Sequence, residues 1–360
     1  MRPGFWRGRR VFVTGHTGFK GGWLSLWLQE LGAEATGYAL PPPTEPSFYD
    51  MTRIAEGMHG HLADIRDLAT LASALRKASP EIVFHLAAQS QVRESYRNPV
   101  ETYATNVLGT VNLLEAVRRT PGVRAVIVVT SDKCYENREW LWGYRETDPM
   151  GGRDPYSNSK GCAELIAGAW RCSYFAPERH AEHGVALASA RAGNAIGGGD
   201  WATDRLIPDM LRAFGQGRPV SLRYPEATRP WQHVLEPLSG YLLLAEKLVE
   251  EGPAFAEAWN FGPAEGASRP VRWIADRLSQ AWGAGAAWVP EPGDHPHEAH
   301  ALSLDCAKSR ARLRWRPRWS LEEALRRIVE WHRPAPGGVD YRMLSLGQIR
   351  DYSSDSATGD

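Results

Sequence analysis

The sequence predicts an α/β fold with a doubly wound parallel sheet and a smaller C-terminal cap. In the first half of the chain, short runs rich in Val and Ile alternate with longer stretches of helical pattern. Near-continuously apolar strands are typical of parallel sheets, because helices cover both faces of such sheets. After about residue 195 the pattern changes to Gly-rich loops, short strands and separate helices. We therefore expect the cap to be built onto the sheet.

Apolar runs bounded by turn residues predict the strands. Residues 10–14 read Arg-Val-Phe-Val-Thr, and residues 123–129 read Val-Arg-Ala-Val-Ile-Val-Val. Such β-branched residues are enriched in strands. The run at 61–63 is short and only weakly strand-like. We expect strands over residues 10–14, 34–40, 61–63, 81–87, 123–129 and 184–190.

Apolar residues at helical spacing predict the helices between these strands. Within residues 100–119, for example, Val107, Val111 and Leu114 recur at this spacing. We expect residues 1–192 to form mainly the sheet region and residues 193–333 mainly the cap, with segments of the two regions interleaved. Residues 334–360 are expected to form a linker and a frayed tail. We expect helices over residues 18–31, 68–75, 100–119 and 156–175, and in the cap over residues 204–215, 237–251, 270–281 and 321–332.

Composition excludes several classes of protein. Lys and Arg total 42, as do Asp and Glu, so the chain is neither a polybasic nucleic-acid binder nor an acidic disordered protein. No apolar run approaches the roughly 18 residues of a transmembrane helix. The basic N-terminus precedes too short an apolar run for a signal peptide. The four cysteines form no CxxC pair and no disulfide scaffold. We expect a cytoplasmic enzyme.

A glycine-rich turn follows the first strand. Gly15, Gly18 and Gly21 give the spacing GxxGxxG between a strand and a helix. A dinucleotide pyrophosphate needs this tight turn, a close approach of backbone, and the positive end of a helix. His16 stands where small residues are usual, so we expect it to crowd the loop. The turn predicts a dinucleotide-binding site.

The second and third strands bear on the choice of dinucleotide. The stretch Gly37-Tyr38-Ala39 offers no carboxylate for the adenine-side ribose, and no Arg cluster suggests a 2′-phosphate. Asp64 and Ile65, after the third strand, are placed to reach the adenine. We expect NAD as the cofactor.

Tyr156 and Lys160 open a predicted helix. Residues four apart share a helical face, so the phenol and the ammonium lie side by side. A free tyrosine has a pKa near 10, and a neighbouring cation is needed to favour the phenolate at neutral pH. The same Lys160 can donate a hydrogen bond to the nicotinamide ribose. The spacing therefore predicts an acid–base pair.

Charged and polar residues follow the fifth strand. Ser131, Asp132 and Lys133 lie at its C-terminal end, where ligands of open α/β sheets bind. Ser131 is placed to hydrogen-bond a substrate oxygen. Asp132 and Lys133 add two ionisable groups beyond what hydride transfer needs, and the plainer alternative is a solvated loop.

Five motifs together resemble the extended short-chain dehydrogenase/reductase family: Gly15-His-Thr-Gly-Phe-Lys-Gly21, His85-Leu-Ala-Ala-Gln89, Asn106-Val-Leu-Gly-Thr110, Thr130-Ser-Asp-Lys-Cys-Tyr135 and Tyr156-x-x-x-Lys160. The resemblance runs from about residue 6 to residue 332. Four further stretches are similar to the branch of this family that dehydrates CDP-glucose: Trp142-Gly-Tyr-Arg-Glu146, the eleven residues from Pro155 to Leu165, the nine from Gly193 to Trp201, and the eight from Arg229 to Glu236.

The resemblance implies a role for each site residue. Tyr156 would be the base at the sugar 4-hydroxyl, Lys160 its helper, and Ser131 the group that holds this hydroxyl. Asp132 would protonate the leaving 6-hydroxyl, and Lys133 would remove the C5 proton. Lys133 stands where the dehydratases usually carry Glu. A lysine at this position is characteristic of the CDP-glucose branch. The implied cofactor contacts are Gly15, His16, Gly18, Phe19, Lys20, Gly21, Asp64, Ile65, Leu86, Ala87, Ala88, Tyr156 and Lys160.

Substrate contacts follow from the same resemblance. Arg229 is the expected clamp on the diphosphate, because its fork binds two oxygens; the alternative is a structural arginine. Ser90 and Gln91 are candidates for contact with the hexose, or form an ordinary loop. The implied substrate contacts are Ser90, Gln91, Asn194, Leu206, Pro208 and Arg229.

The implied reaction is an NAD-dependent intramolecular redox dehydration. CDP-D-glucose would give CDP-4-keto-6-deoxy-D-glucose and water, in the biosynthesis of deoxysugars, polysaccharides and lipopolysaccharide. NAD would be regenerated in each turnover. The resemblance also implies a homodimer in which the helices at 100–119 and 156–175 pair across a two-fold axis.

Other readings remain open. A sugar-nucleotide 4-epimerase would share the glycine loop, Tyr156 and Lys160, and a dehydratase could take another nucleoside diphosphate hexose. A non-catalytic dinucleotide-sensing regulator would tolerate loss of Tyr156, whose presence argues against it. The stretch His295-Pro-His297-Glu298-Ala-His300 resembles a metal cluster, but its spacing does not set ligands on one helical face, and we expect no metal.

Overall fold

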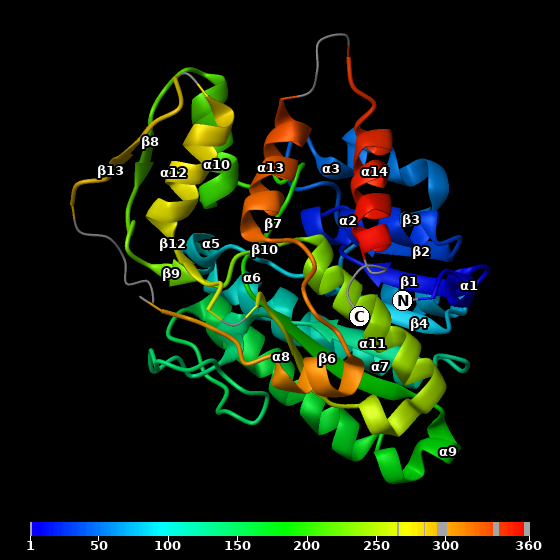
Figure 1. Ribbon diagram of the computed structural model, residues 1–360. Helices are drawn as coiled ribbons and strands as arrows, with labels where there is room; N and C mark the ends of the chain where they lie inside the picture. Colours follow the sequence, from blue (N-terminus) through cyan, green and yellow to red (C-terminus); the bar gives the residue numbers. More distant parts are fainter. Residues whose placement is uncertain (1, 265, 284, 294–300, 334–337, 356–360) are drawn as a thin grey trace.

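A seven-stranded parallel sheet occupies the centre of the protein in the computed structural model, as predicted (Figure 1). The structure describes residues 2–264, 266–283, 285–293, 301–333 and 338–355. The strand order β11-β6-β5-β4-β1-β2-β3 reverses direction on either side of β1 and β4, as in a doubly wound sheet. The strands are β1 (Arg10–Thr14), β2 (Glu34–Ala39), β3 (His59–Leu62), β4 (Ile82–His85), β5 (Ala125–Val129), β6 (Ala186–Ala192) and β11 (Ala258–Phe261).

Helices cover both faces of this sheet. Successive residues of a strand point to opposite faces, so Val11 and Val13 join one core and Phe12 joins the other. The first core contains α2 (Phe19–Glu30) and α11 (Leu235–Glu251). The second core contains α4 (Leu68–Ala78), α7 (Gly109–Arg118) and α8 (Pro155–Ser173).

The predicted helix at 100–119 is an almost continuous helical run with a wider turn in its middle. It comprises α6 (Pro99–Tyr103), the π-helical turn η2 (Ala104–Leu108) and α7. The short α5 (Val92–Arg97), which the sequence pattern did not indicate, precedes it. These segments and α8 contact one another on one face of the molecule.

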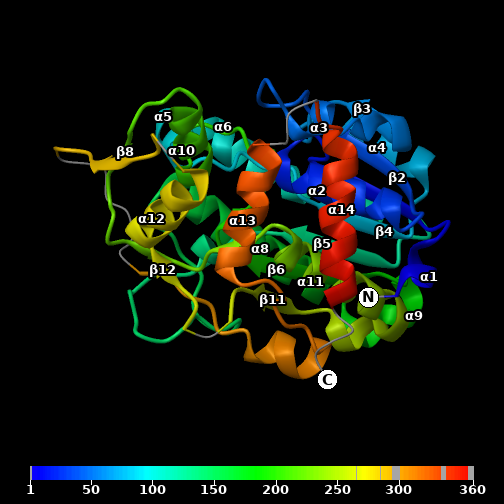
Figure 2. The ribbon, with the colours of Figure 1, turned by 45° about the horizontal axis from the view of Figure 1, so that its top comes forward.

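The cap has a core of its own. Its helices α10 (Leu206–Gly215), α12 (Val271–Trp282) and α13 (Leu321–His332) enclose buried residues such as Met210, Ile274 and Ile328. Strands β8 (Val220–Leu222) and β13 (Trp288–Pro290) pair along its outer side. Figure 2 shows these elements beside the sheet. The predicted cap helices are confirmed, each within two residues at either end.

Two further features depart from the sequence predictions. Strand β11 was not predicted, because Asn260 interrupts its four-residue apolar run. Helix α11 and strand β11 lie beyond residue 193 and pack on or extend the central sheet, so segments of the two regions interleave. The predicted tail at 334–360 is wrong for its middle part, where residues 341–354 form helix α14 (Tyr341–Ser354).

Helix α14 forms because it has a cap and an apolar side. The Asp340 carboxylate accepts hydrogen bonds from two backbone N–H groups of the first turn. Helix α14 lies beside α13 and α2 (Figure 2). Its residues Leu346, Ile349 and Tyr352 are buried in the core that includes α2. The ring of Tyr352 meets Trp27 of α2 edge to face at 5.6 Å. The flanking residues 334–337 and 356–360 lie outside the described residues.

Among the residues that the structure describes, no helix combines the length and apolarity needed to cross a membrane. The remaining elements of the fold are short. They are α1 (Pro3–Trp6), α3 (Phe48–Met51), α9 (His180–His183), β7 (Ala195–Ile196), β9 (Thr228–Arg229), β10 (Gln232–His233), β12 (Arg269–Pro270), and the helical turns η1 (Ile54–Gly57), η3 (Asp132–Cys134), η4 (Pro177–Arg179), η5 (Gly252–Phe255) and η6 (Ser309–Leu313).

Candidate active site

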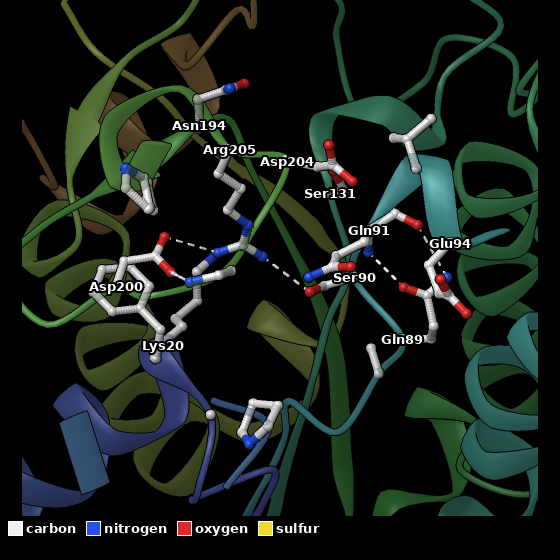
Figure 3. Close-up of a pocket in the computed structure, with 18 of the residues that line it drawn as sticks. Lys20, Gln89, Ser90, Gln91, Glu94, Ser131, Asn194, Asp200, Asp204 and Arg205 are labelled. Carbon is white, nitrogen blue, oxygen red and sulfur yellow. Dashed lines mark hydrogen bonds and ion pairs between the residues drawn. The ribbon is translucent and has the colours of Figure 1, made fainter. Parts of the chain in front are cut away.

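A cavity of about 770 Å³ lies between the C-terminal ends of the parallel strands and the cap. This is the edge at which open α/β sheets bind ligands. Figure 3 shows its middle part, where side chains from the sheet loops and from the start of α10 point toward one another. Every site residue that the sequence predicts lines this cavity except His16.

The glycine loop forms one wall of the cavity. Gly15 has a φ of +78°, and a Cβ there would lie 2.7 Å from the backbone N of Ala87. A Cβ on Gly21 would lie 2.0 Å from the carbonyl oxygen of Gly15. These close approaches leave no room for a side chain and bring the N-terminus of α2 to the cavity. The loop therefore fits a dinucleotide pyrophosphate.

His16 is the predicted contact that the structure places elsewhere. Its ring is fully buried and faces away from the cavity, in the space that Gly37 leaves open. A Cβ on Gly37 would lie 2.4 Å from the ring of His16. Burial lowers the pKa of His16 to about 4, so the ring is neutral. The expectation that His16 crowds the loop is therefore wrong, because Gly37 makes room for it.

Helix α8 carries Tyr156 and Lys160 on its first two turns. Asp154 caps the helix by accepting a hydrogen bond from the backbone N–H of Ser157 at 2.9 Å. Both functional side chains are buried. The ammonium of Lys160 donates to the carbonyl oxygen of Val129 at 3.4 Å. The helix start thus holds both groups against the end of β5.

Burial moves the pKa values of this pair in opposite directions. It raises the pKa of Tyr156 to about 12, with a smaller rise from Asp132, while the Ser131 hydroxyl and the Arg205 guanidinium lower it. Burial lowers the pKa of Lys160 to about 8, against the opposing effect of the Glu164 carboxylate. Without a bound cofactor and substrate, the phenol is therefore protonated at neutral pH.

The turn η3 places Ser131, Asp132 and Lys133 at the end of β5. Oδ1 of Asp132 accepts a hydrogen bond from the Ser131 hydroxyl at 2.9 Å, and Ser131 in turn accepts one from the backbone N–H of Lys133 at 3.2 Å. Asp132 is buried, and burial raises its pKa, although Lys133 and the Ser131 hydrogen bond lower it. Asp132 is thus suited to hold a proton.

The cap contributes the far side of the cavity. Arg229 lies on β9, is buried, and donates to the carbonyl oxygen of Thr228 at 3.0 Å. Leu206 and Pro208 lie in the first turn of α10, and Asn194 precedes β7. The structure therefore brings these cap residues to the same cavity as the glycine loop and α8.

Arg205 is a site residue that the sequence analysis missed. It reaches across the cavity from the start of α10 (Figure 3). Its guanidinium pairs with Asp200 at 3.0 Å and donates to the Ser90 hydroxyl at 2.9 Å. Nearby, Arg93 and Asp204 form an ion pair at 2.8 Å. The charged pair Asp204-Arg205 just before a cap helix was the available signal.

The adenine end of the predicted dinucleotide site combines an ion pair with uncharged side chains. Asp64 pairs with Arg66, which lowers the pKa of its carboxyl, and Ile65 is buried beside it. Thr44 and Ser47, which sequence reasoning did not single out, also line this end. The cavity therefore extends from the glycine loop to Asp64, Thr44 and Ser47. The possible metal ligands at 295–300 lie outside the described residues.

Comparisons with known proteins give a consistent picture. The profile of the NAD dependent epimerase/dehydratase family matches residues 11–262. Over 350 residues the chain is 56% identical to the CDP-glucose 4,6-dehydratase of Salmonella typhimurium, an alignment that covers 97% of this chain and 98% of the relative. It is 29% identical to a dTDP-glucose 4,6-dehydratase of Streptomyces antibioticus, covering 90% and 92%.

Solved structures with the same fold include cofactor complexes. The UDP-glucose 4-epimerase of Thermus thermophilus in complex with NAD superposes with a TM-score of 0.77 at 25% identity, covering 91% of this chain and 99% of that one. A double mutant of the dTDP-glucose 4,6-dehydratase from Streptomyces venezuelae, with NAD bound, gives 0.75 at 25% identity, covering 90% and 97%.

Proposed function

The chain belongs to the NAD dependent epimerase/dehydratase family, and we propose that it converts CDP-D-glucose to CDP-4-keto-6-deoxy-D-glucose and water. The observation that carries the substrate is the 56% identity, over 97% of the chain, to a CDP-glucose 4,6-dehydratase. The cavity supports it, because the glycine loop and the cap line one space of about 770 Å³, in which a cofactor and a sugar nucleotide can lie together.

The cofactor is NAD. Gly15, Gly18 and Gly21 fit its pyrophosphate, because a Cβ on the first or third glycine would strike backbone. Lys160 would hold the nicotinamide ribose, and Asp64 and Ile65 the adenine. When bound, NAD would supply a hydride acceptor for C4 of the sugar and later a hydride donor for C6, and would be regenerated in each turnover.

The oxidation step falls to Tyr156. Its phenolate takes the proton of the 4-hydroxyl as the C4 hydrogen departs with its electron pair. The pKa of the phenol is about 12 in the protein alone, so it must fall when the positively charged nicotinamide ring enters the cavity. Ser131 holds the same hydroxyl, and its hydrogen bond already keeps the pKa of Tyr156 from rising higher.

The elimination step falls to Asp132 and Lys133. The 4-ketone acidifies C5–H, and the amine of Lys133 removes that proton. Burial raises the pKa of Asp132 and so favours its protonated form. This carboxyl gives its proton to the departing 6-hydroxyl, which leaves as water. Lys133 then returns its proton to C5, and the proton that Tyr156 gained replaces the one that Asp132 lost.

The remaining parts of the proposal concern binding and assembly. Arg229 clamps the diphosphate, and Asn194, Leu206, Pro208, Ser90 and Gln91 contact the sugar nucleotide. Residues 1–192 serve mainly the cofactor and residues 193–333 mainly the sugar nucleotide. The setting is cytoplasmic biosynthesis of a deoxysugar of lipopolysaccharide or another polysaccharide.

Assembly as a homodimer is part of the proposal. Val100, Leu108 and Leu165 expose 82%, 51% and 63% of their surface on α6, η2 and α8. Large exposed apolar side chains gathered on adjacent helices are typical of an interface. Light scattering at micromolar concentration is expected to give twice the mass of the chain, and a monomeric mass would rule the dimer out.

Product mass tests the reaction. A dehydratase yields a product lighter than CDP-glucose by one water, whereas a 4-epimerase leaves the mass unchanged. The epimerase reading would leave Asp132 and Lys133 without a task, although both lie beside the predicted base.

A further inference from the structure

A buried ion pair lies directly behind the acid–base pair. Glu164 is on α8, one turn beyond Lys160 and two turns beyond Tyr156. Its carboxylate accepts a hydrogen bond from the guanidinium of Arg191, on β6, at 2.8 Å. The side chains of both residues are at most 4% exposed. Neither residue lines the cavity, and the reaction steps above use neither.

This ion pair connects the elements that carry the catalytic groups. Glu164 also accepts hydrogen bonds from the hydroxyls of Thr130, at 2.5 Å, and Ser189, at 2.7 Å. Thr130 is the residue before Ser131, so the carboxylate ties α8 to the start of η3. The other terminal nitrogen of Arg191 donates a hydrogen bond to the Tyr135 hydroxyl at 2.7 Å. Tyr135 is the residue that follows η3.

The network ends on the outer strand of the sheet. The Tyr135 hydroxyl donates to Oδ1 of Asn260, on β11, at 2.7 Å. Helix α8, strands β6 and β11, and the residues on either side of η3 are therefore held by one set of buried hydrogen bonds. Packed apolar residues could supply comparable stability, because taking two charges out of water offsets much of their attraction. The charges themselves thus call for another explanation.

Electrostatics at Lys160 supplies that explanation. Glu164 lies four residues beyond Lys160 and so shares its helical face, and the Cys134 thiol, the His85 ring and the Lys20 ammonium are also close enough to interact electrostatically with Lys160. Burial lowers the pKa of His85 to about 3 and raises that of Cys134 well above its usual range, so both are neutral at pH 7. Lys20 is a cation. Glu164, whose pKa Arg191 holds down, is therefore the anion in this set.

We propose that Glu164 and Arg191 are positioning residues that set the charge of Lys160 and hold Tyr156, Lys160 and η3 in one arrangement. Glu164 favours the ammonium form of Lys160, which cofactor binding requires. Arg191 limits that effect and fixes the carboxylate in place. This inference rests on the proposed roles of Tyr156 and Lys160.

The two single variants separate charge from structure. In Glu164→Gln the anion is gone while the Arg191 cation stays, so Lys160 loses its proton more easily. In Arg191→Met the carboxylate keeps its Thr130 and Ser189 donors and acts on Lys160 alone. Both variants break the same ion pair, but they change the charge near Lys160 in opposite directions.

The readout is the pH at which NAD affinity falls as Lys160 loses its proton, which we call the alkaline limb. Calorimetry measures this limb across about pH 6 to pH 10, and the pH profile of kcat/KM gives the same limb independently. Glu164→Gln is expected to move the limb to lower pH by about one unit, which is about a fivefold loss near pH 8. Arg191→Met is expected to move it to higher pH. Glu164→Asp is expected to restore most of the wild-type position.

A matched control lies at the opposite end of the strands. Glu81→Gln breaks the ion pair that Glu81 forms with Arg9 at 2.7 Å, and it should leave the limb in place. The proposal would be overturned if the alkaline limb stays fixed in both single variants, or if it moves the same way in both. Glu164 and Arg191 would then have only a structural role. If neither single variant folds, the double variant Glu164→Gln/Arg191→Met decides, because it leaves no unpaired charge. Its limb should lie below that of the wild type, and an unchanged limb overturns the proposal.

The calorimetric arm keeps this inference separate from the proposed reaction. If the wild-type protein binds NAD but does not dehydrate CDP-glucose, the reaction is wrong and the two opposite shifts in NAD affinity still decide the role of the ion pair.

Discussion

The hydroxyl of Ser131 donates a hydrogen bond of 2.9 Å to Oδ1 of Asp132, and Oδ2 of the same carboxyl has no hydrogen-bond partner among the residues that the structure describes. A buried carboxyl oxygen without a partner is costly when ionised, which agrees with the raised pKa of Asp132. Because Asp132 lines the cavity, this carboxyl can carry a proton to a ligand there.

Replacing Asp132 by Asn should separate the two halves of the elimination. Asp132→Asn keeps the shape but cannot donate a proton as a carboxylic acid does. We expect C5 of the substrate to exchange with solvent deuterium at close to the wild-type rate, while loss of water slows about 10²- to 10⁴-fold. Mass spectrometry of the substrate and product in D₂O measures both rates. Equal slowing of exchange and water loss would assign Asp132 to an earlier step.

Lys133→Met should give the complementary result. Without the amine, exchange at C5 is expected to stop, while oxidation at C4, seen as transient absorbance of the reduced cofactor, survives. If exchange continues at the wild-type rate, Lys133 is a binding residue and the C5 base is another group.

Tyr156→Phe removes only the proton acceptor of the first step. The ring stays, so binding of CDP-glucose should change little. The transient absorbance of the reduced cofactor should fall about 10²- to 10⁴-fold. Stopped-flow absorbance measures the step, and calorimetry checks that the substrate still binds. Turnover at the wild-type rate would show that another base does the work.

The glycine loop predicts a loss of cofactor affinity on a minimal change. A methyl group at residue 21 would lie 2.0 Å from the carbonyl oxygen of Gly15, so Gly21→Ala must displace the loop. We expect NAD affinity to fall at least tenfold, or about 1.4 kcal/mol. Gly168→Ala, on α8, is the matched control: no atom lies within 4 Å of its Cβ, so affinity should not change. Equal affinity in the two variants would place the pyrophosphate elsewhere.

Helix α14 supports a prediction about stability. The Tyr352 hydroxyl donates to the Glu236 carboxylate at 2.5 Å and lies 3.0 Å from the Ser239 hydroxyl, all buried. Tyr352→Phe leaves these partners short of one hydrogen bond, so the free energy of unfolding should fall by about 1–3 kcal/mol. Tyr96→Phe, on an exposed side chain, should change it by less than about 0.5 kcal/mol. Urea denaturation compares them, and equal values would mean that α14 does not contribute through this contact.

Local spacing was enough to predict much of this site. The glycine loop and the Tyr156–Lys160 pair are fixed by positions three or four residues apart, and the structure lines one cavity with them. The six expected strands all form, each shifted or shortened by no more than a few residues.

Contacts between distant segments could not be predicted in the same way. Arg205 meets Ser90 across 115 positions, and Tyr352 meets Glu236 across 116. The orientation of His16 depends on the space that Gly37 leaves free. Gly37 lies next to His16 only because strand β1 pairs with strand β2. Helix α14 was missed because Gly and Ser interrupt its apolar pattern, and burial against α2 and α13 stabilises it.

Incubation with CDP-, dTDP-, GDP- and UDP-hexoses, each followed by mass spectrometry, tests the proposed function most directly. The purified wild-type protein with NAD should convert CDP-glucose to a product lighter by one water, with no net consumption of NAD, and should act more slowly on the other three. A product of unchanged mass, or faster dehydration of another nucleoside diphosphate hexose, would contradict the account.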